Sequence, residues 1–325
     1  MAVKWCYRAA RARARAVHSG GALPELGANG NGNHRILVAD ADAATRDLIA
    51  GALRDENFCV TTASDGKEAL KRLEKSKFDV ALLDVWMPRM NGLDVLKALR
   101  RKKSPPKVIV VTSDGETSAI LRAIHERACR CLAKPVDRQA VIEVVREALA
   151  RKSQPPKIEV LSGTPGWIEL RLPCTLEAAE LIESFMNSLE ADLPAETRAT
   201  VGQVFHELLL NAIEWGGQLD PHRKVHVSYL RAKHMLLYRI ADPGRGFRFA
   251  DLRHAAIAHN GEPTEHQGIR QRKGLRPGGF GLVLATAKAD ELLYNEAQNE
   301  VVFVKYLDIA PNGKPTEVSE PAAPK

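Results

Sequence analysis

The sequence predicts two folded domains: a doubly wound α/β domain with a parallel five-stranded sheet, followed by an α+β sandwich. Its 325 residues exceed the ~100–200 residues of a single domain. Between residues 35 and 152, short β-branched runs alternate with amphipathic stretches, which is typical of a parallel sheet. Between residues 159 and 310, helices and strands are grouped, which is typical of an α+β sandwich. A polar, proline-containing stretch at residues 153–158 is the predicted linker.

The first predicted domain contains five strands, each followed by a helix. Every strand is a short run rich in aliphatic or β-branched residues, and every helix has apolar residues on one face. The predicted strands are Ile36–Ala39, Phe58–Thr62, Asp79–Leu83, Val108–Thr112 and Cys129–Ala133. The predicted helices cover residues 43–55, 66–76, 92–102, 116–127 and 137–151. Ligands of doubly wound sheets bind beyond the carboxyl ends of the strands, so candidate site residues are sought there.

The second predicted domain is one sheet covered by one layer of helices. Its first helices are expected at residues 176–189 and 196–215, and the second has the i, i+3, i+4, i+7 apolar spacing of a buried face. A short apolar helix is expected at residues 282–289. The predicted strands cover residues 158–163, 167–174, 224–232, 234–242 and 300–308.

Charge and cysteine content exclude several classes of protein. The net charge is +7, but residues 1–34 hold five Lys or Arg and one Glu, so the remainder carries only +3. This is too little for a nucleic-acid footprint, and we expect no direct nucleic-acid partner. No apolar run reaches the ~18 residues of a membrane span, so no membrane partner is expected. The five cysteines are odd in number and lack zinc-site spacing, which favours a reducing cytoplasm.

Both ends of the chain are predicted to be disordered. Residues 1–34 are Arg- and Ala-rich, then Gly- and Asn-rich, and contain no secretory h-region. An organelle-type presequence, a basic arm, a passive tail and a start-codon artefact remain open interpretations of this segment. Residues 311–325 are Pro- and Lys-rich and form the second predicted tail.

Polar residues stand at the ends of four predicted strands in the first domain. Asp40 follows the first strand, Asp84 the third and Lys134 the fifth, and Thr112 ends the fourth. A carboxylate at this edge can attack a phosphoryl donor, a lysine can neutralise the product, and a threonine hydroxyl can hold a phosphoryl oxygen. One such residue alone is more often a turn or capping residue. Four at successive strand ends predict a phosphoacceptor site.

This segment resembles the response-regulator receiver domain. The sequences ILVADAD, LLDVWMPRMNGLDVL, VTS and AKP carry the resemblance. It implies that Asp84 is the phosphoacceptor, that an upstream histidine kinase is the phosphodonor, and that Mg²⁺ binds to Asp40 and Asp84.

One position departs from the receiver pattern. The family has a second acidic residue, which contacts Mg²⁺, where this chain has Ala41. Asp42 is the neighbouring carboxylate that would have to replace it, and Cys131 stands where the family often has an aromatic residue. Two interpretations therefore stay open: a phosphorylatable receiver, or a weak or degenerate one that serves as a docking module.

Three segments of the second domain predict a nucleotide pocket. Glu207 and Asn211 lie four residues apart and share one helical face, a pattern that alone would more often be an ordinary solvated pair. The sequence ADPGRGF then places Asp242 at a strand end, before two glycines that permit close backbone approach to a ligand. The sequence RPGGFGL places further glycines before an apolar helix, whose free N–H groups suit a phosphate. Residues 247–277, between these segments, are polar and long and are predicted to form a lid.

These segments together resemble the GHKL (Bergerat-type) ATPase domain, in its anti-sigma-factor serine/threonine kinase branch. The resemblance implies that Glu207 is the general base, that Asn211 binds Mg²⁺ with ATP, and that Asp242 holds the adenine amino group. The ATP-binding residues that it implies are Asn211, Asp242, Gly244, Gly246, Arg276, Gly279 and Gly281. Trp215 departs from the pattern, because relatives commonly have histidine there.

Two functions fit this combination. The first is a two-component signalling protein in which the receiver gates an ATP-dependent serine/threonine kinase that phosphorylates an anti-sigma antagonist of the STAS type. The second is a non-catalytic ATP-binding protein that exchanges partners, including a sigma factor, behind a degenerate receiver. Glu207 favours the kinase, because binding alone needs no base. A histidine kinase is disfavoured because no helical hairpin precedes the ATPase segment, and a DNA-binding regulator because no helix-turn-helix pattern is found. A homodimer is compatible with either function.

Overall fold

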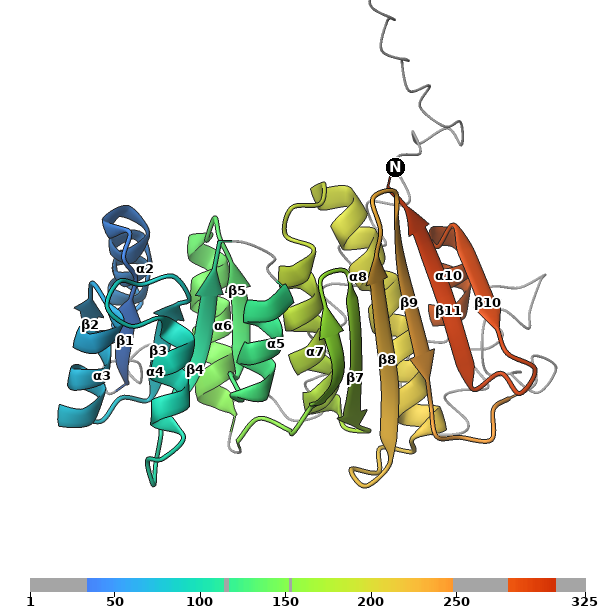
Figure 1. The fold of residues 1–325 in the computed structure, drawn as a ribbon, viewed down its shortest axis with the longest axis horizontal. Helices are drawn as coiled ribbons and strands as arrows, with labels where there is room; N and C mark the ends of the chain where they lie inside the picture. The colour runs from blue at the N-terminus through green and yellow to red at the C-terminus, as the bar shows by residue number, and fades with distance from the viewer. Residues whose placement is uncertain (1–33, 114–116, 152–153, 248–279, 308–325) are drawn as a thin grey trace, which may run out of the picture. The chain divides into compact units, whose positions relative to one another are not determined.

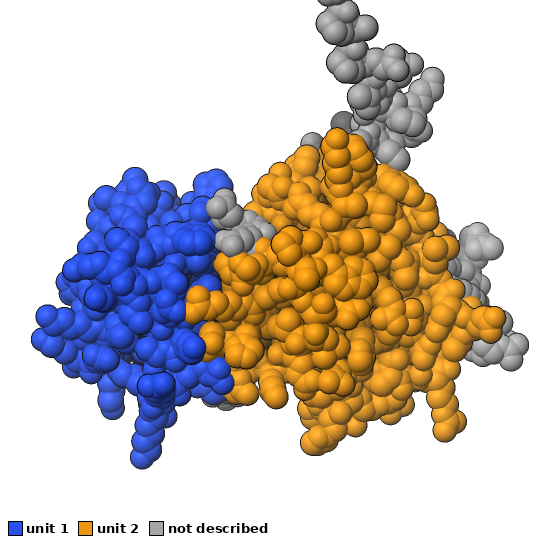
Figure 2. Space-filling model, in the orientation of Figure 1, with its two compact units in different colours: residues 1–113, 128–154, 249–280 blue, residues 114–127, 155–248, 281–325 orange. Residues whose placement is uncertain are grey.

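The structure is a computed structural model, and it describes residues 34–113, 117–151, 154–247 and 280–307. Two compact units are distinguished in Figure 2, and each is described by itself. The first contains a parallel sheet and the second an antiparallel sheet (Figure 1). Among the described residues, no helix is both long and apolar enough to span a membrane.

The first sheet has five parallel strands in the order β2-β1-β3-β4-β5. The strands are β1 (Arg35–Ala39), β2 (Cys59–Ala63), β3 (Val80–Asp84), β4 (Lys107–Thr112) and β5 (Arg130–Ala133). The helices that follow them in the chain are α2 (Ala43–Asp55), α3 (Gly66–Lys75), α4 (Gly92–Leu99), α5 (Thr117–His125) and α6 (Arg138–Ala150). This strand order confirms the predicted doubly wound sheet. In the division into units, α5 belongs to the second unit.

Four helices begin where an Asp or Asn side chain caps them. The side chain of Asp42 accepts a hydrogen bond from the N–H of Thr45 at the start of α2, and Asp65, Asn91 and Asp137 do the same for α3, α4 and α6. Such a cap satisfies one of the otherwise unpaired N–H groups of the first turn and stabilises the helix by about 1 kcal/mol. The caps therefore fix the points at which the loops turn into helices.

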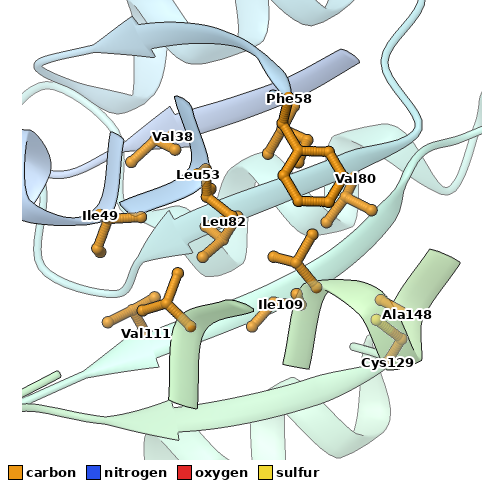
Figure 3. Close-up of a cluster of buried hydrophobic side chains, with 13 residues drawn as sticks. Val38, Ile49, Leu53, Phe58, Val80, Leu82, Ile109, Val111, Cys129 and Ala148 are labelled. Carbon is orange, nitrogen blue, oxygen red and sulfur yellow. The ribbon is translucent and has the colours of Figure 1, made fainter. Parts of the chain in front are cut away.

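The core of the first unit is formed by strand residues packed against α2 and α6 (Figure 3). Figure 3 shows Val38, Leu82 and Ile109 of the sheet in one cluster with Ile49 and Leu53 of α2. All five are at most 1% exposed. Burying each such side chain contributes about 1.5–3 kcal/mol, so this cluster holds the strands in register.

The second sheet has six antiparallel strands in the order β10-β11-β9-β8-β7-β6. They are β6 (Glu159–Thr164), β7 (Trp167–Pro173), β8 (Lys224–Arg231), β9 (Met235–Ala241), β10 (Glu291–Tyr294) and β11 (Glu300–Tyr306). Between these strands in the sequence lie the helices α7 (Leu176–Leu189), α8 (Ala195–Asn211) and α10 (Gly281–Lys288). The arrangement confirms the predicted α+β sandwich.

One face of this sheet is buried under α8. Along β9, Leu236, Tyr238 and Ile240 are at most 1% exposed, whereas the alternate residues are only partly buried. The Tyr238 ring stacks on Phe303 of β11, and its centroid lies 4.9 Å from that of Phe205 on α8. Aromatic packing therefore fixes α8, which carries two candidate site residues, on the centre of the sheet.

Two elements differ from the prediction. The helix expected to run to residue 215 leaves the α-helical form after Asn211 and continues as a π-helical turn, η2 (Ala212–Gly216). Strand β10 was not predicted, because its four residues, ELLY, are too few for a period-2 pattern to be recognised. It forms because it pairs with β11, from Glu291 opposite Val304 to Tyr294 opposite Val301.

Candidate functional site

Three of the predicted phosphoacceptor-site residues form one cluster at the carboxyl edge of the first sheet. Asp40 follows β1 and Asp84 ends β3, and the Nζ of Lys134, just after β5, lies 3.0 Å from Oδ2 of Asp40 and 3.2 Å from Oδ2 of Asp84. Thr112 ends β4 at the same edge and is 1% exposed. The parallel topology thus brings residues from four strand ends to one place, as the sequence predicts.

Burial shapes the charges of this cluster. Asp40 and Asp84 are 1% and 3% exposed. Burial, and then the charge of Asp40, raise the pKa of Asp84, and Lys134 only partly opposes them. Burial lowers the pKa of Lys134, but its hydrogen bond to Asp40 and the charges of both carboxylates outweigh this, so its pKa is raised. The lysine is therefore held as a cation between two carboxylates.

The cluster offers two carboxylates rather than three. Ala41 has no ligand atom, and the exposed Asp42 uses its carboxylate to accept hydrogen bonds from the N–H and Oγ1 of Thr45 at the start of α2. These bonds lower the pKa of Asp42. Within the described residues, no group of three or more His, Cys, Asp and Glu side chains could hold a metal ion.

One atom of the cluster nevertheless fits a cation. The Oδ1 of Asp84 is buried and has no hydrogen-bond partner among the described residues. A buried carboxylate oxygen without a partner is costly, and Mg²⁺ prefers such hard oxygen ligands. Asp40 and Asp84 therefore fit Mg²⁺, with one carboxylate fewer than the receiver pattern provides.

The second cluster begins at the end of α8. Glu207 and Asn211 lie one turn apart on this helix, and η2 follows directly. A Cβ added to Gly216, the last residue of η2, would lie 2.1 Å from the Asp242 carboxylate. The π-helical turn, a feature common at functional sites, therefore brings the end of the helix against Asp242.

Asp242 follows β9 and is held by its own loop. Its Oδ1 accepts a hydrogen bond of 2.7 Å from the N–H of Gly244. Burial raises the pKa of Asp242, although this bond and the charge of Arg223 oppose the change. A Cβ on Gly244 would lie 2.7 Å from Oδ1 of Asp242 and 2.9 Å from Cα of Gly216. Two glycines therefore approach the half-buried Asp242 carboxylate so closely that a side chain at either position would clash.

Helix α10 approaches the other end of this cluster. A Cβ on Gly281, its first residue, would lie 2.3 Å from Oε2 of Glu207. Further along the same pair of helices, the Nζ of Lys288 is bonded to Oε1 of Gln203. Helix α10, which the RPGGFGL segment opens, therefore begins against Glu207, the predicted base. Arg276, Gly279 and residues 248–277 of the predicted lid lie outside the described residues.

Sequence reasoning missed Asn299. This residue precedes β11, its backbone O accepts a hydrogen bond of 2.8 Å from the N–H of Asp242, and its Nδ2 donates one of 3.0 Å to the O of Gly244. Its distance in sequence from Asp242 gave no signal, since only the pairing of β11 with β9 brings the two together. An Asn in a turn just before a strand was the one available hint.

Comparisons with known proteins find one family match in each half of the chain. Residues 36–146 match the family model of the response regulator receiver domain. Residues 172–305 match that of the histidine kinase-like ATPase domain. The chain therefore combines a receiver domain with a kinase-like ATPase domain, as two-component signalling proteins do.

Similar proteins come from several bacteria and an archaeon. The chain is 30% identical to the DNA-binding response regulator MtrA of Mycobacterium tuberculosis over 202 residues, 61% of this chain and 87% of that protein. It is 33% identical to a CpxR homolog of Haemophilus influenzae over 132 residues, 39% of this chain and 57% of the relative. Among solved structures, a CheY-like receiver domain from Methanospirillum hungatei is 28% identical, with a TM-score of 0.35 over 36% of this chain and 93% of that one.

The similarity to MtrA covers most of that protein at 30% identity. The receiver model matches the whole length of the parallel sheet, from β1 to α6. We conclude that the chain belongs to the response-regulator family and carries a histidine-kinase-like ATPase domain as its second half.

Proposed function

We propose that this protein is a cytoplasmic, ATP-dependent serine/threonine kinase controlled by its receiver domain. Its substrate would be a small anti-sigma antagonist of the STAS type, and an upstream histidine kinase would supply the phosphoryl group for Asp84. The observation that carries the proposal is the contact of Gly281 with the Glu207 carboxylate, which sets the candidate base at the start of α10. A nucleotide-binding protein with no transfer step has no need of a base at this place.

The chemistry follows from the placement of three side chains. Asp242 would bind the adenine amino group, Gly244 and Gly246 would line the ring, and Asn211 would hold Mg²⁺ between the phosphates. The bound Mg²⁺ would neutralise charge on the transferring phosphoryl group. Glu207 would take the proton of the substrate hydroxyl as its oxygen forms a bond to the γ-phosphorus, while the bond to the β-phosphate oxygen breaks and ADP leaves. Arg276, Gly279 and Gly281 complete the proposed phosphate contacts.

The receiver would supply the control. An Asp84 oxygen would accept the phosphoryl group from the phosphohistidine of the upstream kinase, with Asp40 and Asp84 holding Mg²⁺ and Thr112 contacting a phosphoryl oxygen. Lys134, already within 3.2 Å of Oδ2 of Asp84, supports this role, because it would pair with the added negative charge.

A second function is favoured by Ala41. With one carboxylate fewer, the receiver would bind Mg²⁺ weakly and act as a docking module, and the second half would be a non-catalytic ATP-binding switch that exchanges an antagonist and a sigma factor. A homodimer is compatible with both proposals.

Phosphoryl transfer from labelled ATP distinguishes these functions. The purified chain is incubated with Mg²⁺, labelled ATP and STAS-type antagonist proteins from the same genome. If the protein is a kinase, the label appears on a serine or threonine of the antagonist. Glu207→Ala should lose this transfer but still bind ATP, whereas Asn211→Ala should lose both transfer and ATP binding. Glu214→Ala, a change of the same type in η2, is the control. ATP binding without transfer to any antagonist, and with no effect of Glu207→Ala, would favour the exchange switch.

A further inference from the structure

The loop between β10 and β11, residues 295–299, contacts the glycine loop, residues 242–246, at three of its residues. At one end, the N–H of Asp242 donates to the O of Asn299, 2.8 Å away. In the middle, Nδ2 of Asn299 donates to the O of Gly244 at 3.0 Å. These two bonds join a loop of the proposed adenine pocket to a segment that is more than fifty residues away in the chain.

The other end of the glycine loop touches the same turn. Gly246 has a φ of +80°, and a Cβ there would lie 1.6 Å from the O of Ala297, so only glycine fits. Just beyond, the ring of Phe247 meets that of Tyr294 edge to face, with centroids 5.8 Å apart. The turn therefore touches the glycine loop at both ends and in the middle.

The turn is itself braced from within. Oδ1 of Asn295 accepts hydrogen bonds from the N–H groups of Asn299 and Glu300, at 3.1 and 3.2 Å, and its Nδ2 donates to Oδ1 of Asn299 at 2.8 Å. Gln298 has a φ of +58°, and its Oε1 is buried with no hydrogen-bond partner among the described residues. Backbone strain of this kind persists where the surrounding structure holds it, and it is concentrated at functional sites.

We propose that the β10–β11 turn is a positioning element of the nucleotide pocket and that Asn299 is its positioning residue. This inference rests on the proposed ATP-binding function. Asn299 would act through Asp242: its side chain holds the carbonyl of Gly244, whose N–H in turn holds the Asp242 carboxylate. The carboxylate is thereby aimed at the exocyclic amino group of adenine before the nucleotide arrives, and pre-organisation of this kind strengthens binding.

The side chain of Asn299 can be tested apart from its backbone. Asn299→Ala removes the side-chain bonds to the O of Gly244 and to Nδ2 of Asn295, but it keeps the backbone bond to Asp242, which any residue can make. We expect calorimetric titration of the full chain with Mg²⁺ and ATP to show about fivefold weaker binding, the usual effect of losing one hydrogen bond such as the one that holds Gly244. Asn187→Ala, at an exposed position on α7, is the matched control and should bind as the wild type does.

Comparing the affinities for ATP and inosine triphosphate distinguishes a positioning role of Asn299 from a merely structural one. Inosine triphosphate lacks the amino group that Asp242 is proposed to bind, so Asn299→Ala should leave its affinity within about twofold of wild type. In an Asp242→Asn background, Asn299→Ala should likewise add less than about twofold to the loss of ATP affinity, because residues acting through one another are not additive. Equal weakening toward both nucleotides, or additive effects of the two substitutions, would overturn the inference.

The failures can be told apart. If the wild type binds no ATP, the proposed function fails, and this inference with it. If the wild type binds ATP and Asn299→Ala binds it equally well, only the inference fails. If Asn299→Ala melts well below the wild type, Asn295→Ala is tested in its place, because it removes only the hydrogen bonds within the turn. We expect weaker ATP binding in this variant, and unchanged binding would count against the proposal.

Discussion

At the scale of single residues, Ala41 leaves the candidate phosphoacceptor site with two carboxylates. The neighbouring Asp42 is committed to capping α2, and Lys134 holds the two remaining carboxylates. The affinity of an oxygen site for a hard cation depends on the number of its charged ligands. We therefore expect this alanine to weaken Mg²⁺ binding.

Restoring the missing carboxylate tests this reading. We expect Ala41→Asp to tighten Mg²⁺ binding about tenfold or more, because it adds a charged ligand beside Asp40. Trp86 lies two residues from Asp84 and is 54% exposed, so its fluorescence can report the titration. Ala44→Asp, which adds the same charge within the first turn of α2, is the control. An unchanged Mg²⁺ affinity in Ala41→Asp would show that Ala41 does not limit the site.

Glu190 makes the stability of the second unit depend on pH. It is 2% exposed, and burial raises its pKa from 4.5 to about 7, although the hydrogen bond from Tyr238 and the charge of Arg231 oppose the change. The folded state therefore binds this proton more tightly than the unfolded state. Stability is greatest below about pH 4.5 for this group and is lost as the pH rises through about 7.

Glu190→Gln should remove that dependence. Between pH 5 and 8 we expect the free energy of unfolding of the wild type to fall by about 2–3 kcal/mol more than that of the variant, since one pKa unit corresponds to about 1.4 kcal/mol. Urea unfolding followed by circular dichroism at both pH values measures the difference. Glu177→Gln, at an exposed position on α7, should keep the wild-type dependence. A parallel fall in Glu190→Gln and the wild type would contradict the assignment.

At the scale of elements, the contact between α8 and α10 joins two parts of the proposed nucleotide site. Gly281 opens α10 directly against Glu207. On α8 itself, Gly202 has nothing within 4 Å of an added Cβ and is exposed. Substitution by alanine should therefore affect phosphoryl transfer at Gly281 but not at Gly202.

Gly281→Ala should slow phosphoryl transfer about tenfold or more, because its methyl group displaces the Glu207 carboxylate, and small misplacements of a catalytic group are costly. Gly202→Ala should leave transfer unchanged and stabilise the second unit by about 0.5–1 kcal/mol through its higher helix propensity. Transfer rates and thermal melts of both variants check these outcomes. Normal transfer by Gly281→Ala would argue against Glu207 as the base.

Most elements were predictable, and those that were not depend on long-range contacts. The helix predicted over residues 176–189 is α7, with the same bounds in the structure. The change to a π-helical turn at Ala212 was not predicted from the apolar spacing, and it brings Gly216 against Asp242, a residue far away in the sequence. Likewise, Asp40, Asp84 and Lys134 were found because parallel strand ends share an edge, whereas Asn299 was missed because a sheet pairing places it.

At the scale of the whole molecule, the two halves carry different chemistry on one chain. The receiver is proposed to change state at Asp84, and the ATPase domain is proposed to act at Glu207. Allosteric coupling between two sites typically amounts to about 1–3 kcal/mol, or about 5- to 150-fold. A signal at the first site should therefore be measurable as a rate at the second.

Beryllofluoride, a phosphoryl mimic, tests this coupling. With Mg²⁺ present, we expect it to change the rate of transfer to the antagonist about fivefold or more, in a direction that the experiment establishes. Asp84→Asn should abolish the effect without changing the basal rate, and Asp47→Asn, an exposed position on α2, should preserve it. A rate indifferent to beryllofluoride, despite its binding at Asp84, would support the docking-module reading of the receiver.

The positions of β10 and β11 in the chain determine when the second sheet can form during synthesis. Strand β11 lies between β10 and β9, and both β10 and β11 come from the final part of the chain, after α10. A nascent chain can close the parallel sheet and form the phosphoacceptor cluster long before these strands leave the ribosome, since domains generally fold as units, N-terminal first. A product truncated before residue 291 would keep Asp84 and lack the turn that holds Asp242. Such a fragment should draw phosphoryl groups from the upstream donor without passing them into any output.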